Sequence, residues 1–198
     1  MRWTWMLAAI GLAACSQTPA APATQTETTT NSAAATSVAA GPGCTAEANR
    51  AWVVGTIAYQ IDARLIGPDC ARAVAFVVIR NPAGQPLYAD AGPIAQIPLA
   101  FNPRADARTM QENLAAWIET EPMAQDASQL PAWPAGAATA PATISTRLSR
   151  AAYEAIRAEA APLFCYPDSA ESHACAALDA LHGTITPLGS LRPEAARR

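Results

Sequence analysis

The sequence of 198 residues contains no lysine, so all 13 of its basic residues are arginines. These arginines are scattered along the chain, and the only adjacent pair is Arg197 and Arg198 at its end. A surface that binds nucleic acid shows clustered basic side chains interleaved with aromatic ones. The spacing therefore argues against DNA or RNA as a partner.

Histidine is scarce as well, since the chain has only His173 and His182. A Ser-His-Asp site would have to use one of them, with Ser169, Ser172 or Asp179 as the nearest partners, and neither histidine lies near a G-x-S-x-G turn. A catalytic triad is defined by geometry in space and not by closeness in sequence. We expect both histidines in exposed turns and no catalytic residues, with a hydrolase as the alternative.

No apolar stretch reaches the roughly 20 residues that a membrane-spanning helix needs. The one at the N-terminus runs from Trp3 to Ala14, follows the cation of Arg2, and ends in Leu12-Ala13-Ala14-Cys15. A positive start, an apolar stretch and small residues before a cleavage point are the features of an export signal. The tetrad at its end resembles the lipobox of bacterial lipoprotein signal peptides.

This resemblance implies that residues 1–14 are removed and that Cys15 becomes the lipidated first residue. Two or three acyl chains, such as palmitate, hold a protein stably at a membrane, whereas one chain binds only marginally. The residue directly after the cysteine is Ser16 and not aspartate, and in this respect the chain resembles the outer-membrane lipoproteins of enterobacteria. The implied location is the periplasm-facing cell envelope, at the outer membrane in preference to the inner one. The alternative is an ordinary signal peptide cut elsewhere, with Cys15 incidental.

A second segment, residues 15–43, lacks the residues that build a core. From Ser16 to Gly43 it has no aromatic residue and a single charge, Glu27. Such a composition cannot bury enough apolar surface to offset the entropy of ordering. We expect a disordered tether that leads into one globular domain, residues 44–198.

That domain carries the four remaining cysteines, Cys44, Cys70, Cys165 and Cys175. An even number of cysteines in an exported chain predicts disulfides, and four allow three pairings. We favour Cys44 with Cys70, which would fasten the start of the domain, and Cys165 with Cys175, which would clip a hairpin.

The segment from Cys165 to Cys175 also contains His173, and sulfur and imidazole ligands suit copper(I) or zinc. However, its spacing matches no closed zinc pattern. The chain also lacks the C-x-x-C pair used for disulfide exchange. We therefore expect no metal and no cofactor, and keep Cys165, His173 and Cys175 as the weaker alternative site.

Apolar alternation predicts strands in the first half of the domain. Residues 52–66 read as one amphipathic strand, whose apolar face comprises Val53, Ile57, Tyr59, Ile61, Ala63 and Leu65. Residues 73–80 are apolar on both faces, as expected of a central strand that is covered on both sides. The turn residues 81–84 and the strand that starts at Leu87 then complete an antiparallel hairpin.

Helical spacing appears twice further along. Asn102-Pro103 predicts the start of a helix that runs to about residue 120, with Met110, Leu114, Trp117 and Ile118 on its apolar stripe. A second helix is expected over residues 149–160, with Tyr153, Ile156 and Ala160 inside. Residues 163–166, residues 175–178 and a segment from Gly183 predict short strands. The predicted class is α+β: a small antiparallel sheet packed by about two helices.

Between these helices, residues 122–141 are rich in proline and alanine but contain Leu130 and Trp133. Trp133 has two interpretations, a contact for a partner or an anchor that holds the loop on the core. We favour the anchor, because burying an aromatic ring orders such a segment at little cost.

These observations do not define a biochemical activity. The leading interpretation is a lipid-anchored envelope protein that acts as a non-catalytic binding or structural module. Its partners would be the membrane, through Cys15, and an envelope protein or a cell-wall component. A periplasmic hydrolase and an inhibitor of a cell-wall lytic enzyme are the alternatives.

Overall fold

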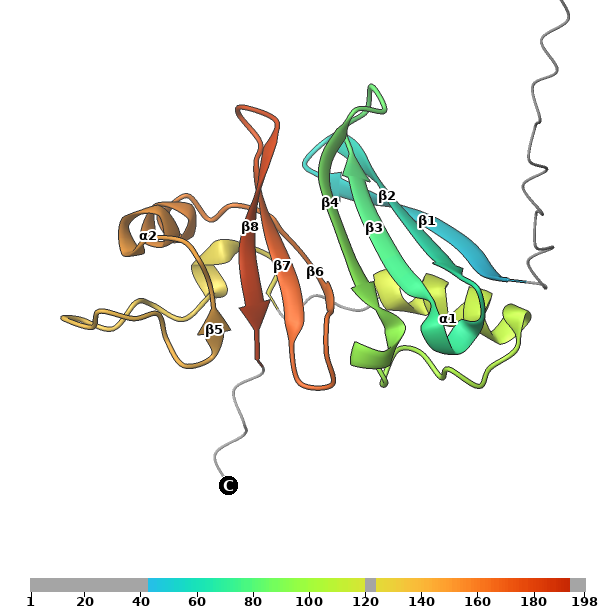
Figure 1. Cartoon of the computed structure of the whole chain (residues 1–198). Coiled ribbons are helices and arrows are strands. Elements are labelled where there is room, and N and C mark those ends of the chain that lie inside the picture. The colour runs from blue at the N-terminus through green and yellow to red at the C-terminus, as the bar shows by residue number, and fades with distance from the viewer. Residues whose placement is uncertain (1–42, 120–123, 193–198) are drawn as a thin grey trace, which may run out of the picture. The chain divides into compact units, whose positions relative to one another are not determined.

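The computed structural model describes residues 43–119 and 124–192. The expected signal peptide, Cys15 and the tether up to residue 42 lie outside the described residues. Figure 1 shows the elements in chain order: β1 (Cys44–Val54), β2 (Ile57–Gly67), β3 (Val74–Arg80), β4 (Pro86–Pro93), α1 (Ala107–Glu119), β5 (Ile144–Ser145), α2 (Arg150–Ala158), β6 (Leu163–Pro167), β7 (His173–Asp179) and β8 (Thr184–Leu191).

The strands form two antiparallel sheets, which we call the first and the second sheet. The first has the order β1-β2-β3-β4 and the second the order β5-β8-β7-β6. The α+β class, with two α-helices, antiparallel sheets and two disulfides, is confirmed. The expected small sheet is thus divided into two sheets of four strands each.

The strand expected over residues 52–66 is in fact the end of β1 and most of β2. A tight turn at Gly55 and Thr56 separates them, and Gly55 adopts a positive φ of 61°, which glycine tolerates without strain. Tyr59 and the alternate residues that follow it are buried as expected. Val53 and Ile57 are not, since the turn places them at the exposed tip of the hairpin, and Val53 is 63% exposed.

Strand β3 is an interior strand of the first sheet, and it pairs with β4 through the turn at residues 81–84. The expectation that it is covered on both sides is wrong, because Ala75, Val77 and Ile79 are buried on one face whereas Phe76 is exposed on the other. The Asn81 side chain closes this turn, because its Oδ1 accepts from the Gln85 backbone N–H at 2.9 Å. The expected hairpin is therefore confirmed.

Helix α1 begins later than Asn102-Pro103 predicts. The Asp106 carboxylate accepts a hydrogen bond from the Thr109 N–H at 2.8 Å and caps the first turn. Asn102 makes a separate turn instead, in which its Oδ1 accepts from the Arg104 N–H at 3.0 Å. The expected apolar stripe of Met110, Leu114, Trp117 and Ile118 is buried.

Helix α2 begins as predicted, with the Ser149 hydroxyl accepting from the Ala152 N–H at 3.2 Å. It ends at Ala158, earlier than expected, and Ala160 is exposed with a φ of 48°. The Ala161 N–H donates back to the Ile156 carbonyl at 3.4 Å, as in a left-handed helix ending. This ending turns Ala160 away from the core, whereas Tyr153 is buried as expected.

Trp133 is an anchor for its loop, as favoured from the sequence. Its indole is buried, and its Nε1–H donates to the Ala137 carbonyl at 3.1 Å. Its ring packs edge-to-face with that of Tyr153, with the ring centroids 5.7 Å apart. Leu130 is buried in the same region. The proline-rich segment is therefore held on the second sheet by side-chain packing.

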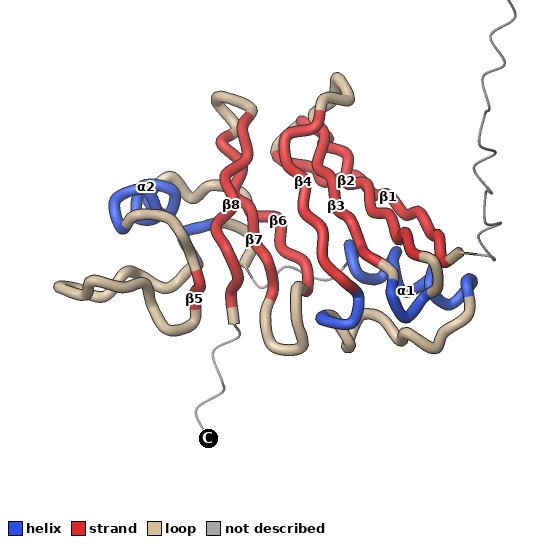
Figure 2. The backbone as a smooth tube through the Cα atoms, viewed as in Figure 1, coloured by secondary structure: helices blue, strands red, loops and turns tan. Residues whose placement is uncertain are grey.

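Strand β6 separates two hydrophobic cores. Phe164 and Tyr166 join the first core, which the inner face of the first sheet forms with α1. Leu163 and Cys165 belong to the second core, together with Trp133 and Tyr153. Figures 1 and 2 show the resulting arrangement, in which the second sheet lies between α2 and the first sheet.

The outer edge of the first sheet is partly covered by a side chain from α1. The Gln111 Oε1 accepts from the Glu47 backbone N–H at 3.1 Å, and its Nε2 donates to the Glu47 carbonyl. Both backbone groups lie on edge strand β1. Gln111 thus occupies hydrogen-bonding positions that another strand would use.

The two disulfides join Cys44 to Cys70 and Cys165 to Cys175, which are the pairs favoured from the sequence. The second bond links directly opposed residues of β6 and β7. Within residues 43–119 and 124–192, no helix has the length and apolar composition needed to cross a membrane.

We predict that changing both Cys165 and Cys175 to alanine lowers the free energy of unfolding by about 3 kcal/mol. The bond closes a short loop and so removes conformations from the unfolded chain. Urea unfolding of the variant and the parent protein measures the difference. An unchanged midpoint and slope would show that the bond does not constrain the unfolded state.

Candidate binding site

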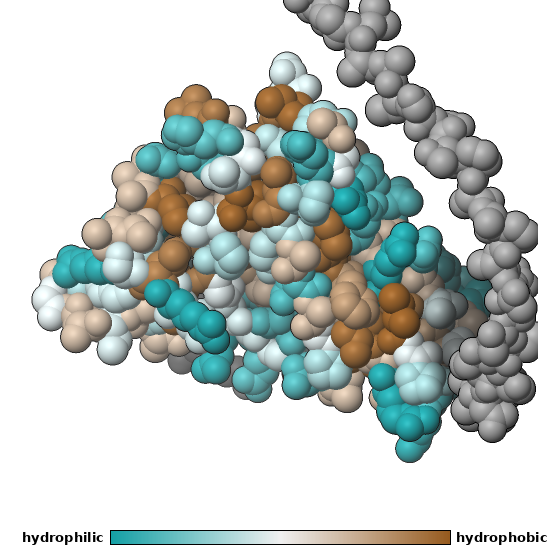
Figure 3. Space-filling view, turned by 45° about the horizontal axis from the view of Figure 1, so that its top comes forward, coloured by the Kyte–Doolittle hydropathy of each residue, from teal (hydrophilic) through white to brown (hydrophobic). Residues whose placement is uncertain are grey.

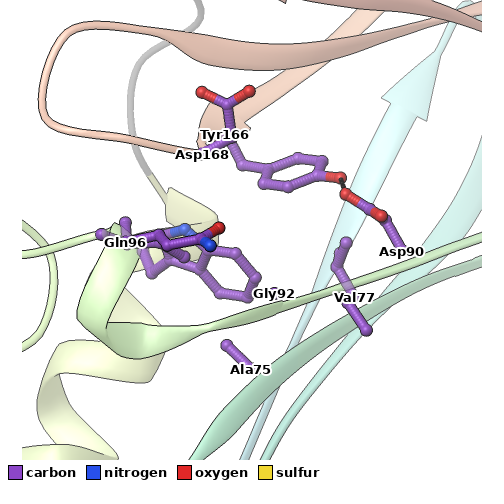
Figure 4. A pocket seen from close by; sticks show the side chains of 10 residues that line it. Ala75, Val77, Asp90, Gly92, Gln96, Tyr166 and Asp168 are labelled. Carbon is purple, nitrogen blue, oxygen red and sulfur yellow. Dashed lines mark hydrogen bonds between the residues drawn. The ribbon is translucent and has the colours of Figure 1, made fainter.

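The face shown in Figure 3 carries small hydrophobic patches set among hydrophilic residues. A more defined feature is a cavity of about 160 Å³ at the junction of the first sheet, α1 and β6. Its lining, drawn in Figure 4, consists of Ala75, Val77, Asp90, Ala91, Gly92, Gln96, Ile97, Trp117, Tyr166 and Asp168. A concave site with aromatic walls and a few polar groups is the usual form of a ligand pocket.

The floor of the cavity is built from small residues on the inner faces of β3 and β4. Ala75 pairs with Gly92 across the two strands. A Cβ added to Gly92 would meet no atom within 4 Å, because the space above this position is open. The cavity therefore exists partly because β4 has no side chain at this position.

Two tyrosines and a carboxylate form a chain of hydrogen bonds beside the cavity. The Tyr166 hydroxyl donates to Asp90 Oδ2 at 2.5 Å (Figure 4), and the hydroxyls of Tyr166 and Tyr88 lie 2.8 Å apart. Because the Tyr166 proton points to Asp90, Tyr88 must donate to Tyr166. Burial raises the pKa of both tyrosines, and the neighbouring Asp90 carboxylate adds to this effect. Both phenols therefore stay neutral in the physiological pH range.

Asp168 forms the opposite rim of the cavity and is held by hydroxyl groups. Ser172 Oγ donates to its Oδ1 at 2.5 Å, and Ser190 Oγ donates to its Oδ2. Neither Asp168 nor Asp90 takes part in an ion pair within the part of the chain that the structure describes. Both carboxylates remain without a cationic partner in that part.

Trp117 fixes the wall between α1 and β6. Its indole Nε1–H donates to the Pro167 carbonyl at 2.7 Å, and its ring meets the edge of Tyr166 with centroids 5.3 Å apart. Phe101 packs against the same indole, with the ring centroids 5.6 Å apart. These contacts hold the indole ring in one position, where it forms part of the cavity wall.

On another side of Trp117 lies a second hollow of about 340 Å³, lined by Leu99, Ala100, Asn113, Ala116, Trp117, Pro167, Ser169, Ala170 and His173. Here the structure differs from the expectation for His173, which is partly buried at the start of β7. Its Nδ1 is buried and has no hydrogen-bond partner within residues 43–119 and 124–192. Burial lowers its pKa, although the charge of Asp168 opposes this effect.

The structure does not assemble the residues considered for nucleophilic catalysis. Ser169 and Ser172 bond to each other at 2.6 Å, and Ser172 bonds directly to the Asp168 carboxylate. His182 pairs with Asp179 at 2.6 Å and is exposed in a turn, as expected. The hydrogen bonds that join serine, imidazole and carboxylate into a triad are therefore not formed at these positions.

The metal alternative is overturned at its sulfur ligands. Cys165 and Cys175 are buried and joined in a disulfide, whereas the thiolate is the form that binds metal. Among the described residues, no group of three or more histidine, cysteine, aspartate or glutamate side chains is placed to hold a metal ion. His173 is thus left as part of the second hollow.

Comparisons of this chain with protein-family models, with curated proteins and with solved structures gave no match. We therefore infer function from the chemistry of the cavity and of the N-terminal sequence. The cavity residues Tyr88, Asp90 and Tyr166 were not singled out from the sequence, and Asp168 was considered only as part of the segment from Cys165 to Cys175. The i, i+2 spacing of Tyr88 and Asp90 is a signal that could have placed these two side chains on one face of a strand.

We predict that the free energy of unfolding falls above about pH 10, where tyrosines of the unfolded chain ionise. Burial raises the folded-state pKa of Tyr166, and it raises that of Tyr153 to about 12. The folded protein therefore keeps protons that the unfolded chain loses, so this stabilisation is complete below about pH 10 and declines above it.

Urea unfolding between about pH 9 and about pH 11 measures this slope. Tyr166→Phe removes one of these tyrosines and should make the decline shallower, by roughly 1.4 kcal/mol per pH unit. An identical slope in the variant and the parent protein would contradict the inferred burial of this hydroxyl.

Proposed function

We propose that this chain is a lipid-anchored protein of the bacterial cell envelope, and that its domain binds a small ligand through a protonated amine or guanidinium group. The observation that carries the proposal is the cavity bordered by Asp90 and Asp168. None of the described residues that line it is basic. The negative charges of the two carboxylates are therefore not balanced by a positive side chain of the cavity lining.

Electrostatics favours a cation in this position. Asp90 is exposed and Asp168 partly buried, so a ligand reaches the carboxylates without unfolding the domain. A cleft lined by charge of one sign, with low-dielectric walls, raises the local concentration of ligands of the opposite sign. Hydrogen bonds to charged groups are also stronger than neutral ones.

Binding without catalysis agrees with the polar geometry. Asp168 is held by two serine hydroxyls, and the phenol of Tyr166 is held by Asp90 and Tyr88. A nucleophile is activated by a general base that lies within hydrogen-bond distance and accepts its proton. The hydroxyl groups here instead fix the carboxylates, so the hydrolase alternative gains no support from them.

The proposed location rests on the N-terminal sequence. Leu12-Ala13-Ala14-Cys15 follows an apolar stretch and resembles a lipobox. Two disulfides in the domain agree with an oxidising compartment such as the periplasm. The membrane, through lipid on Cys15, and an envelope protein or a cell-wall component are the proposed partners, with the outer membrane as the proposed site.

We predict that Cys15→Ser abolishes labelling by a fatty-acid probe and leaves uncleaved precursor, because the sulfur is the atom that receives lipid. Metabolic labelling and membrane fractionation of cells that express the full chain measure both effects. Ser16→Ala is the matched control and should be labelled normally. Full labelling of Cys15→Ser would exclude this anchor.

We also predict that agmatine, a guanidinium amine, binds the domain and that Asp168→Asn weakens its binding at least about tenfold. Removing one charged hydrogen-bond partner costs about 1.5–3 kcal/mol, and about 1.4 kcal/mol is tenfold in affinity. Isothermal titration calorimetry measures the dissociation constants. Higher salt should weaken binding in the parent protein.

Two further variants test the position of this site. Gly92→Val fills open space in the cavity and should abolish agmatine binding while preserving the circular dichroism spectrum. Glu112→Gln removes an exposed acid of α1 that does not line the cavity, and should bind agmatine like the parent protein. Equal binding by all four proteins would reject the cavity as the cation site.

A further inference from the structure

The acidic cavity opens beside two other hollows. The second hollow shares Trp117 with it. A third, of about 490 Å³, shares Gln96 and Asp168 with the cavity, and Ser169 and Ala170 with the second hollow. The three hollows therefore adjoin one another around the loop between β6 and β7. We call them together the groove.

The two ends of the groove differ in chemistry. The cavity end carries the carboxylates of Asp90 and Asp168. The second hollow has no aspartate, glutamate, arginine or lysine in its described lining, its one imidazole belongs to His173, and it is mainly apolar. Leu99 stands on its rim with 79% of its surface exposed, and Ala100 and Pro167 belong to the same lining.

Polar groups in the second hollow are of a kind that a peptide backbone can use. Asn113 offers an amide that both donates and accepts. Ser169 donates its hydroxyl proton to Ser172, which itself donates to Asp168, so the Ser169 oxygen can only accept from a ligand. His173 belongs to the same lining, but its Nδ1 is buried, has no hydrogen-bond partner among the described residues, and is not counted among the groups that a ligand can reach. An apolar side chain together with its own peptide group would match this mixture.

We propose that the groove binds a peptide segment in which an arginine or lysine is followed by an apolar residue. This proposal rests on the proposed function, because the basic side chain occupies the acidic cavity. The apolar neighbour lies in the second hollow against Leu99, Ala100 and Pro167. The backbone between them passes Asp168 and Ser169, where the third hollow connects the two ends.

Two capped dipeptides test this proposal against the folded domain with its disulfides intact. Acetyl-Arg-Leu-amide and acetyl-Arg-Gly-amide carry the same guanidinium and differ only in the apolar side chain. We expect the leucine peptide to bind about tenfold more tightly, since burying part of a leucine side chain gives a gain of that order. Calorimetric titration gives both dissociation constants.

Leu99→Ser should remove this preference, so that both dipeptides bind with equal affinity. Leu99 is so exposed that its loss leaves the core unchanged. Leu181→Ser is the matched control, because Leu181 is 94% exposed and lies outside the groove, and it should keep the tenfold preference.

The outcomes separate this proposal from the proposed function. If agmatine and both dipeptides fail to bind, both proposals are wrong. If agmatine binds and the two dipeptides bind equally to the parent protein, the cation site stands and the peptide groove is rejected. A preference for leucine that survives Leu99→Ser would also reject the groove, because the apolar side chain would then be bound elsewhere.

Discussion

The alternation of side chains along β6 is the constraint on which the rest of the domain depends. Phe164 and Tyr166 face the first core, and Leu163 and Cys165 face the second. A strand whose successive side chains point to opposite faces can serve two cores only when both faces are covered. The cavity inherits its wall from this packing, since Tyr166 is both a core residue and the hydrogen-bond donor to Asp90.

Much of the fold follows from local patterns in the sequence. The apolar run that became β3, the turn residues at 81–84 and the helical stripe of α1 each identified their element. The errors arose where two local patterns competed. Apolar alternation continues across Gly55, so it hid the hairpin turn, and Asn102-Pro103 resembled a helix start as strongly as Asp106, which supplies the actual cap.

The site was much less accessible from sequence than the fold. Tyr166 and Asp90 are 76 residues apart and meet only because β6 packs against the first sheet. Neither periodicity nor composition specifies such a contact between sheets. The segment around His173 attracted attention for its density of reactive side chains, but its cysteines proved to be structural. The sequence identified reactive residue types in this segment, but which residues line the cavity depends on how the strands pack.

The two hydrogen bonds between the Gln111 side chain and the Glu47 backbone affect how copies of this domain can associate. An uncovered edge strand is a template on which another chain can add a strand, and this is a common route to aggregation. The lipid anchor proposed above would confine copies of the domain to one surface, where they would meet more often than freely diffusing copies. By occupying backbone groups of β1, a single glutamine side chain makes this margin of the sheet a poor starting point for intermolecular β-structure, so crowding need not lead to aggregation there.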